Sequence, residues 1–258
     1  MVDEPGVVAR LRAAGSVFAE DEAALLRDSA ATSLELESML RRRVAGEPIE
    51  VIVGWADFYG HRVVVEPGVF VPRTRTGVLV DQGVRLLEPG GVAVDLCCGS
   101  GAVGLALHHR VDGLQLHASD IDPAAVRCAR RNLEPLGGTV HEGDLFAALP
   151  GTLRGGVDLV AVNAPYVPTA AIPTMPPEAR EHEPRVALDG GADGVALHRR
   201  VAADAAGWLS PGGHLVIETS GRQAELTARA MRDAGLVPRI VTDPAVDGTA
   251  VIGHAAAS

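Results

Sequence analysis

The chain has 258 residues, 47% of them apolar, and a formal net charge of −10. This length accommodates one large domain with a small appendage, and the acidic charge argues against a protein that binds duplex nucleic acid, which presents a basic face. All 23 positively charged side chains are arginines, which excludes a Walker-type phosphate loop ending in lysine, Schiff-base chemistry and dehydrogenases with a Tyr-Lys pair.

The cysteines and apolar segments indicate a cellular compartment. Cys97, Cys98 and Cys128 have the spacing of neither a zinc site nor a disulfide framework, so we expect reduced thiols and no bound metal. The N-terminus lacks the pattern of a secretion signal, and no apolar run is long enough to span a bilayer. These features predict a soluble, cytoplasmic protein without a membrane partner.

Residues 1–46 predict a small N-terminal helical domain. Thr32 and Glu35 have the spacing of a capping box at the start of a helix, and Gly46 followed by Pro48 ends that helix.

A linker then leads into the main domain. From residue 49 to residue 71 the sequence consists of short β-like runs, which favour a β-hairpin within a linker over residues 47–76. Residues 77–258 are expected to form the main domain, which begins with a helix at residues 77–87.

The first strand expected in the main domain, residues 92–96, contains Asp95. The turn after it carries glycines in the pattern G-x-G-x-x-G, namely Gly99, Gly101 and Gly104. Such glycines let a ligand approach the main chain at the start of a helix. The next strand ends at Asp120, the spacing at which an acid meets ribose hydroxyls in dinucleotide folds. These features predict a cofactor that contains adenosine.

The glycine pattern fits both a dinucleotide and S-adenosylmethionine, and the spacing to Asp120 does not separate them. The carboxylate of Asp95 would repel a pyrophosphate at the helix start, but it suits the ammonium group of a methionine moiety. Cys97 and Cys98 are interpreted as small side chains beneath a tight loop rather than as a redox pair. Asp144, after a third strand, is a candidate acceptor for an adenine amino group.

Residues 157–162 form an apolar run typical of a strand covered on both faces of a parallel sheet. Such strands carry function at their carboxyl ends, and this one is followed by Asn163, Ala164, Pro165 and Tyr166. The proline stiffens the turn. The Asn163 side-chain oxygen and an adjacent backbone carbonyl can accept both hydrogens of an NH2 group, with Tyr166 stacked beside it. An asparagine that only caps a loop is the alternative interpretation.

The remaining segments predict a doubly wound α/β sheet with a final hairpin. Further strands and helices are expected at residues 214–219, 236–241, 248–253, 194–209 and 221–234. The Pro-rich connection over residues 167–193 is interpreted as a partly ordered lid, and its Glu181-His182-Glu183 cluster as solvated charge.

Several motifs, in this order, resemble those of class I S-adenosylmethionine-dependent methyltransferases. More narrowly, nearly the whole chain resembles the bacterial protein-glutamine methyltransferases that modify peptide-chain release factors, the HemK/PrmC family. The motifs are Asp95-Leu-Cys-Cys-Gly-Ser-Gly101, Asp120 with Pro123, Gly143-Asp144-Leu-Phe146, Asn163-Ala-Pro-Tyr166 and Glu183-Pro184 with Ala187-Leu188. The resemblance implies a Rossmann-like, seven-stranded sheet with one antiparallel strand, behind an N-terminal helical domain.

The resemblance also implies roles for the site residues. The loop from Asp95 to Gly101, with Cys97 and Gly99, would hold the methionine part of S-adenosylmethionine, Asp120 its ribose and Asp144 its adenine.

The turn of residues 163–166, which we call the corner, would bind the substrate. Asn163, which would also approach the cofactor, and the Ala164 carbonyl would hold the target glutamine amide, with Pro165 and Tyr166 beside it. The target in this family is the glutamine of a Gly-Gly-Gln loop in a release factor.

The chain departs from the family pattern at two places. Ala164 stands where the motif has a proline, and Arg75 and Gly77 stand where the family has acidic residues. Two other functions therefore remain open at this stage. One is methylation of an exocyclic amine such as that of adenine in nucleic acid, because those enzymes share this type of turn. The other is a nicotinamide-dependent oxidoreductase, which fits the glycines but leaves the Asn163 corner unexplained.

Overall fold

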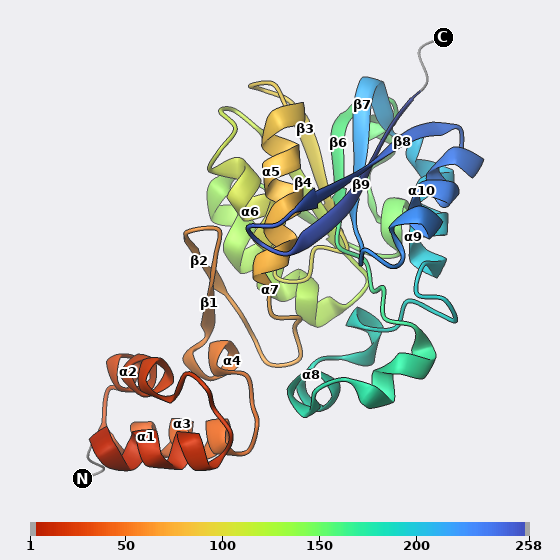
Figure 1. Cartoon of the computed structure of the whole chain (residues 1–258). Helices are drawn as coiled ribbons and strands as arrows, with labels where there is room; N and C mark the ends of the chain where they lie inside the picture. Colours follow the sequence, from red (N-terminus) through yellow and green to blue (C-terminus); the bar gives the residue numbers. More distant parts are fainter. Residues whose placement is uncertain (1–3, 256–258) are drawn as a thin grey trace.

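The computed structural model describes residues 4–255 and has a seven-stranded sheet at its centre (Figure 1). The strands lie in the order β5-β4-β3-β6-β7-β9-β8, and β9 is antiparallel to both of its neighbours while the other pairs are parallel. The strands are β3 (Val92–Leu96), β4 (Gln115–Asp120), β5 (Thr139–Glu142), β6 (Val157–Val162), β7 (Leu209–Glu218), β8 (Leu236–Asp243) and β9 (Gly248–Ala255). The predicted mixed sheet with a final hairpin is confirmed.

Helices cover both faces of this sheet. Because side chains alternate along a strand, Leu159 and Ala161 of β6 face one apolar cluster while Val160 and Val162 face another. The first cluster is closed by α5 (Gly77–Leu86), α6 (Ala102–His108) and α7 (Pro123–Leu133), and the second by α9 (Ala196–Ala205) and α10 (Ala224–Asp233). Among residues 4–255, no helix has the length and apolar character needed to cross a membrane.

Strand β7 begins five residues earlier than the expected strand at residues 214–219. Leu209 pairs with Val157, and the register then shifts before Leu159 pairs with His214. The bulge requires glycine, because a Cβ at Gly213 would stand 2.6 Å from the Val157 carbonyl oxygen.

The N-terminal helices lie apart from the sheet (Figure 1) and share their own apolar cluster. They are α1 (Glu4–Ala13), α2 (Ala19–Ser29) and α3 (Ser33–Val44). The predicted cap of α3 is present, since Thr32 Oγ1 accepts from the Glu35 backbone N–H at 3.1 Å and the Glu35 carboxylate accepts from the Ala31 N–H at 2.8 Å. This cluster also includes Ile52 of the following segment, so the boundary of the N-terminal domain at residue 46 remains our proposal.

The linker contains a helix that the sequence pattern did not predict. Residues 49–53, expected to be β-like, form α4 (Ile49–Val53), and the hairpin follows as β1 (Trp55–Phe58) and β2 (His61–Val64). The prediction was wrong because Val51 and Ile52 are buried, and packing outweighs their β propensity. Gly54, at φ 84°, ends the helix in the left-handed conformation. The linker and main-domain boundaries at residues 47, 76 and 77 remain our proposal.

The Pro-rich connection folds back on itself. It contains short helical turns at residues 169–174 and 185–187 and helix α8 (Pro177–His182). Its two ends are joined, because Val167 N donates to Leu188 O at 3.0 Å and Gly190 N donates to Val167 O at 2.8 Å. We call residues 167–193 the lid.

Candidate active site

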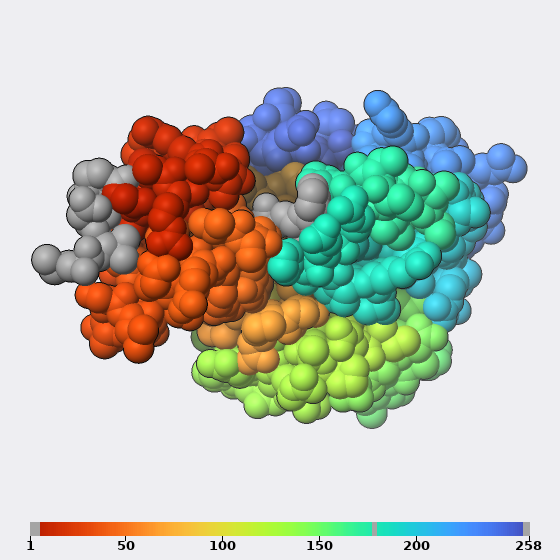
Figure 2. Space-filling model, turned by 90° about the horizontal axis from the view of Figure 1, so that it is seen from below, coloured from red at the N-terminus to blue at the C-terminus, as the bar shows by residue number. Residues whose placement is uncertain are grey.

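A cavity of about 630 Å³ lies at the carboxyl ends of β3, β4 and β6, where open α/β sheets bind ligands. Its rim includes part of the linker and part of the lid, which lie side by side on the face seen in Figure 2. Nine predicted site residues line it, namely Asp95, Cys97, Gly99, Asp120, Asp144, Asn163, Ala164, Pro165 and Tyr166. The fold therefore brings both predicted groups, from the glycine loop and from the corner after β6, into one cavity.

Gly101 is absent from the cavity lining but is needed beneath it. It precedes α6 at φ 79°, and a Cβ there would stand 2.9 Å from Leu133 Cδ1. Gly99 differs, because its added Cβ would meet open space although its φ is 54°. One glycine thus permits close packing, and the other leaves the main chain open to a ligand.

The carboxylate of Asp95 is 2% exposed, and its Oδ2 accepts from the Gly104 backbone N–H at 2.9 Å. This bond fixes the first turn of α6 beside the cavity. Burial raises the pKa of Asp95 to about 7, although the Gly104 hydrogen bond lowers it. A cation bound next to this group would therefore favour its ionised form.

Two further carboxylates lie along the same wall. Asp120 accepts from the Gly99 and Asp122 backbone N–H groups, each at 2.9 Å, and burial raises its pKa. Asp144 pairs with Arg200 of α9 at 2.6 Å. The sequence had singled out both acids but not Arg200, which no local pattern connects to Asp144.

Cys97 and Cys98 lie in the glycine loop, and both have free thiols. Cys97 adopts the left-handed conformation, with φ 59°, while Cys98 is buried. Burial and nearby carboxylates raise the pKa of both thiols, which keeps them protonated and unreactive. In the part of the chain that the structure describes, no three His, Cys, Asp or Glu side chains are grouped as metal ligands would be.

The corner after β6 is held by side chains from two other segments. Asn163 Nδ2 donates to Thr76 Oγ1 at 3.4 Å. The Tyr166 hydroxyl donates to Glu218 Oε1 at 3.2 Å and accepts from Arg75 Nε at 3.1 Å. Thr76 and Arg75 belong to the turn before α5, and Glu218 ends β7.

Glu218 was missed by the sequence reasoning. It is 1% exposed, and burial raises its pKa, whereas the Thr76 hydroxyl and the Arg75 guanidinium, 3.5 Å away, lower it. Its Oε2 accepts no hydrogen bond from the described residues. The available signal was an acid at the end of an apolar strand run, since Glu218 is the last residue of β7 as Asp120 is of β4.

The lid contributes one correction. Glu183 was interpreted as part of a solvated cluster, but its side chain is buried and pairs with Arg73 of the linker. The interpretation was wrong for this residue because the lid folds back onto the linker, where the arginine offsets the cost of burying the carboxylate. Glu181 is exposed, as expected.

The comparisons with known proteins agree with this geometry. Residues 61–175 match the family model "Methyltransferase small domain". The release factor glutamine methyltransferase of Geobacter sulfurreducens is 39% identical over 189 residues, which cover 72% of this chain and 66%, just under two thirds, of that protein. The 4-amino-L-phenylalanine/4-methylamino-L-phenylalanine methyltransferase of Streptomyces pristinaespiralis is 36% identical over 228 residues, 84% of this chain and 77% of that protein.

A solved methyltransferase structure from Pyrococcus furiosus shares the fold, with a TM-score of 0.57 and 15% identity over 76% of this chain and 89% of that one. These relatives decide against the nicotinamide-dependent oxidoreductase that the glycines also allowed. The chain is a methyltransferase, and it belongs to the family that contains the release factor glutamine methyltransferases.

Proposed function

We propose that the protein transfers a methyl group from S-adenosylmethionine to the side-chain amide nitrogen of a glutamine in a protein, namely the Gly-Gly-Gln loop of a peptide-chain release factor. The observation that carries this proposal is the position of Asn163, whose amide is held by Thr76 in the same cavity as the glycine loop. The names of several relatives support the choice of substrate.

The residues present fit the cofactor. Open space at Gly99 leaves the main chain accessible, and the buried Asp95 carboxylate suits an ammonium group. The loop from Asp95 through Cys97 to Gly101 would hold the methionine part. When bound, S-adenosylmethionine supplies an electrophilic methyl carbon on a sulfonium.

The other end of the cofactor would meet two acids, one at the end of β4 and one just after β5. Asp120 would hold the ribose, because two backbone N–H groups fix its carboxylate while further acceptor sites remain. Asp144, oriented by Arg200, would accept from the adenine amino group.

The corner would bind the target amide by an ordered set of donors and acceptors. The Thr76 hydroxyl interacts with the Glu218 carboxylate, so its oxygen is free to accept from Asn163 Nδ2. Asn163 Oδ1 then remains as an acceptor, and the Ala164 carbonyl is a second acceptor for the substrate NH2 group. Tyr166, together with Pro165, would pack beside the plane of the amide.

No strong base is obligatory for this reaction. An amide nitrogen is a poor nucleophile, and its proton becomes acidic only as the bond to carbon forms. The site would act mainly by aligning the nitrogen with the methyl group and by offering acceptors that strengthen as positive charge develops on nitrogen.

The test is direct methylation of a purified release factor. The protein is incubated with methyl-labelled S-adenosylmethionine and a release factor, and the labelled residue is mapped by mass spectrometry. We expect label on the glutamine of the Gly-Gly-Gln loop and none on a variant with Gly-Gly-Glu. An unlabelled release factor under conditions where other molecules are labelled would refute the proposal.

A second candidate is methylation of an arylamine on a small amino acid. The Streptomyces relative aligns with 84% of this chain, and Arg75 lies half exposed at the cavity beside Tyr166, where a guanidinium could pair with a carboxylate. An arylamine also offers two N–H hydrogens to the corner. The same assay with 4-amino-L-phenylalanine distinguishes the two, because Arg75→Gln should then raise KM for this substrate and not for the release factor.

A further inference from the structure

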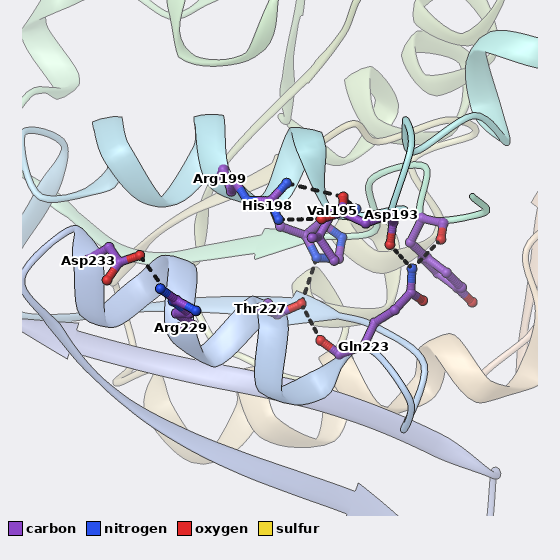
Figure 3. A network of polar contacts seen from close by, with 9 residues as sticks. Asp193, Val195, His198, Arg199, Gln223, Thr227, Arg229 and Asp233 are labelled. Carbon is purple, nitrogen blue, oxygen red and sulfur yellow. Dashed lines mark hydrogen bonds and ion pairs between the residues drawn. The ribbon is translucent and has the colours of Figure 1, made fainter. Parts of the chain in front are cut away.

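The main chain of the corner is bound by a glutamine at the start of α10, a helix that packs in the same apolar cluster as Ala164. Gln223 lies at the start of α10, and its side chain points toward the lid end at Asp193 (Figure 3). Its Nε2 donates to the Tyr166 carbonyl at 2.8 Å and to the Asp193 carbonyl at 3.1 Å. One NH2 group therefore joins the corner to the end of the lid, across 27 residues of sequence.

The Gln223 amide has one possible orientation. Its Oε1 accepts from the Ser220 hydroxyl at 2.6 Å, so a flipped amide would place an oxygen against two carbonyls. The residue is 8% exposed. Its own carbonyl accepts from the backbone N–H of Thr227, whose hydroxyl contacts buried His198 at 2.8 Å (Figure 3). The Gln223 side chain thus extends from a backbone position that is itself fixed by hydrogen bonds.

The glycines beside this contact leave no space for a side chain. A Cβ at Gly194 would stand 2.0 Å from Gln223 Nε2 and 2.4 Å from the Tyr166 carbonyl oxygen. A Cβ at Gly190 would stand 2.7 Å from Tyr166 Cα. The end of the lid therefore packs against the main chain of the corner with no room for side chains.

This contact bears on the stiffness of the corner. Pro165 fixes one φ, but Ala164 before it has no ring to restrict its own φ. The Ala164 carbonyl, which is one of the two proposed acceptors for the substrate, lies between Asn163 and the Tyr166 carbonyl that Gln223 holds. Because Gln223 holds the Tyr166 carbonyl, the Ala164 carbonyl two residues before it can move less.

We propose that Gln223 is a positioning residue for methyl transfer, which holds the Tyr166 carbonyl and the lid end together and so fixes the two substrate acceptors of the corner. This role rests on the proposed function above. It acts on the substrate side of the cavity, since the side-chain hydrogen bonds of Gln223 join it to Ser220, Tyr166 and Asp193.

The experiment uses Gln223→Met, which keeps the length of the side chain and removes both donors. We expect kcat on the release factor to fall by about tenfold or more, as misplaced reacting groups cause, with S-adenosylmethionine affinity unchanged. Hydrogen–deuterium exchange should quicken in the peptide that covers residues 160–168. Adding Ala164→Pro, which restricts φ at that position, should restore most of kcat. Gln115→Met, at an exposed glutamine of β4, is the matched control and should leave kcat, S-adenosylmethionine affinity and exchange unchanged.

The proposal is overturned if Gln223→Met leaves kcat unchanged, or if it weakens cofactor binding as much as turnover. If Ala164→Pro is itself inactive, Ser220→Ala takes its place, since it removes the donor to Gln223 Oε1. A kcat loss smaller than that of Gln223→Met, with the same faster exchange, supports the positioning role of Gln223. Unchanged kcat and unchanged exchange oppose it. Exchange requires no substrate, so it tests the contact even if the wild-type protein methylates no release factor, and that failure would count against the proposed function only.

Discussion

The two walls of the cavity are held by different means. The wall after β3 and β4 is held by local turns, in which Gly101 takes a left-handed conformation and Asp95 and Asp120 bind backbone N–H groups nearby. The wall after β6 is held by Thr76 and Gln223, which lie 87 and 57 residues away from their partners in sequence. The contacts of Asp95 and Asp120 thus span at most 21 residues of sequence, while those of the second wall join segments that are far apart in the chain.

The largest expected effect is a loss of turnover without a loss of cofactor affinity. Asn163→Ala removes the side-chain acceptor of the second wall, and we expect turnover to fall by about two or more orders of magnitude, as losing a preorganised partner does. Cofactor affinity, which belongs to the first wall, should survive. Single-turnover rates and calorimetric titration with S-adenosylmethionine measure the two, and parallel losses in both would remove the distinction between the walls.

The next prediction concerns the contribution of the first wall to folding stability. Gly101→Ala introduces a Cβ 2.9 Å from Leu133 Cδ1 at a left-handed position, and we expect it to destabilise folding by about 1–3 kcal/mol. Gly137→Ala is the control, because its φ is 84° but its Cβ would meet open space. Urea unfolding should show the larger loss at Gly101, and equal losses would assign the whole effect to backbone strain.

The buried acid of the first wall predicts a pH dependence. Because the pKa of Asp95 is raised to about 7, the group is mostly protonated at pH 6 and ionised at pH 8, and a ligand ammonium needs the ionised form. We expect S-adenosylmethionine affinity to rise by about tenfold between these values. In the free protein the sign is opposite, since a carboxyl with a raised pKa loses its contribution to stability as pH rises toward 7. Asp95→Asn should flatten the binding profile, and an equally steep profile in that variant would exclude Asp95 as its source.

The smallest expected effect concerns the Thr76 hydroxyl, which holds Asn163 in the second wall. Thr76→Val removes the hydroxyl that accepts from Asn163 while keeping the shape of a buried side chain. The same change removes the contact of this hydroxyl with the Glu218 carboxylate. We expect kcat to fall by about three- to tenfold, the order of one to two hydrogen bonds. Thr76→Ser keeps the hydroxyl and should retain most of the activity. A serine variant as impaired as the valine variant would show that packing, and not the hydroxyl, is what matters.

The same contrast explains how much the sequence predicted. The strand at residues 157–162 and the glycine loop were predicted within a residue, because apolar runs and glycines express local requirements. The helix at residues 49–53 was not, because its Val and Ile residues favour strands and only burial makes them helical.

The missed site residues share a different cause. Glu218, Gln223 and Arg200 take their roles from partners in distant segments. In sequence each is an ordinary polar residue near the end of a strand or in a helix. Only the folded sheet shows that Arg200 lines the cavity and that Glu218 and Gln223 hold Tyr166, which lines it.

The joined ends of the lid have a consequence for replacing the residues between them. Since Val167 is hydrogen-bonded to Leu188 and Gly190, the residues between them begin and end at a closed base. Exchange, shortening or lengthening of the lid tip therefore need not disturb the corner after β6. We propose that a tip grafted from a relative with another acceptor would change which molecule is admitted while the transfer chemistry stays as it is.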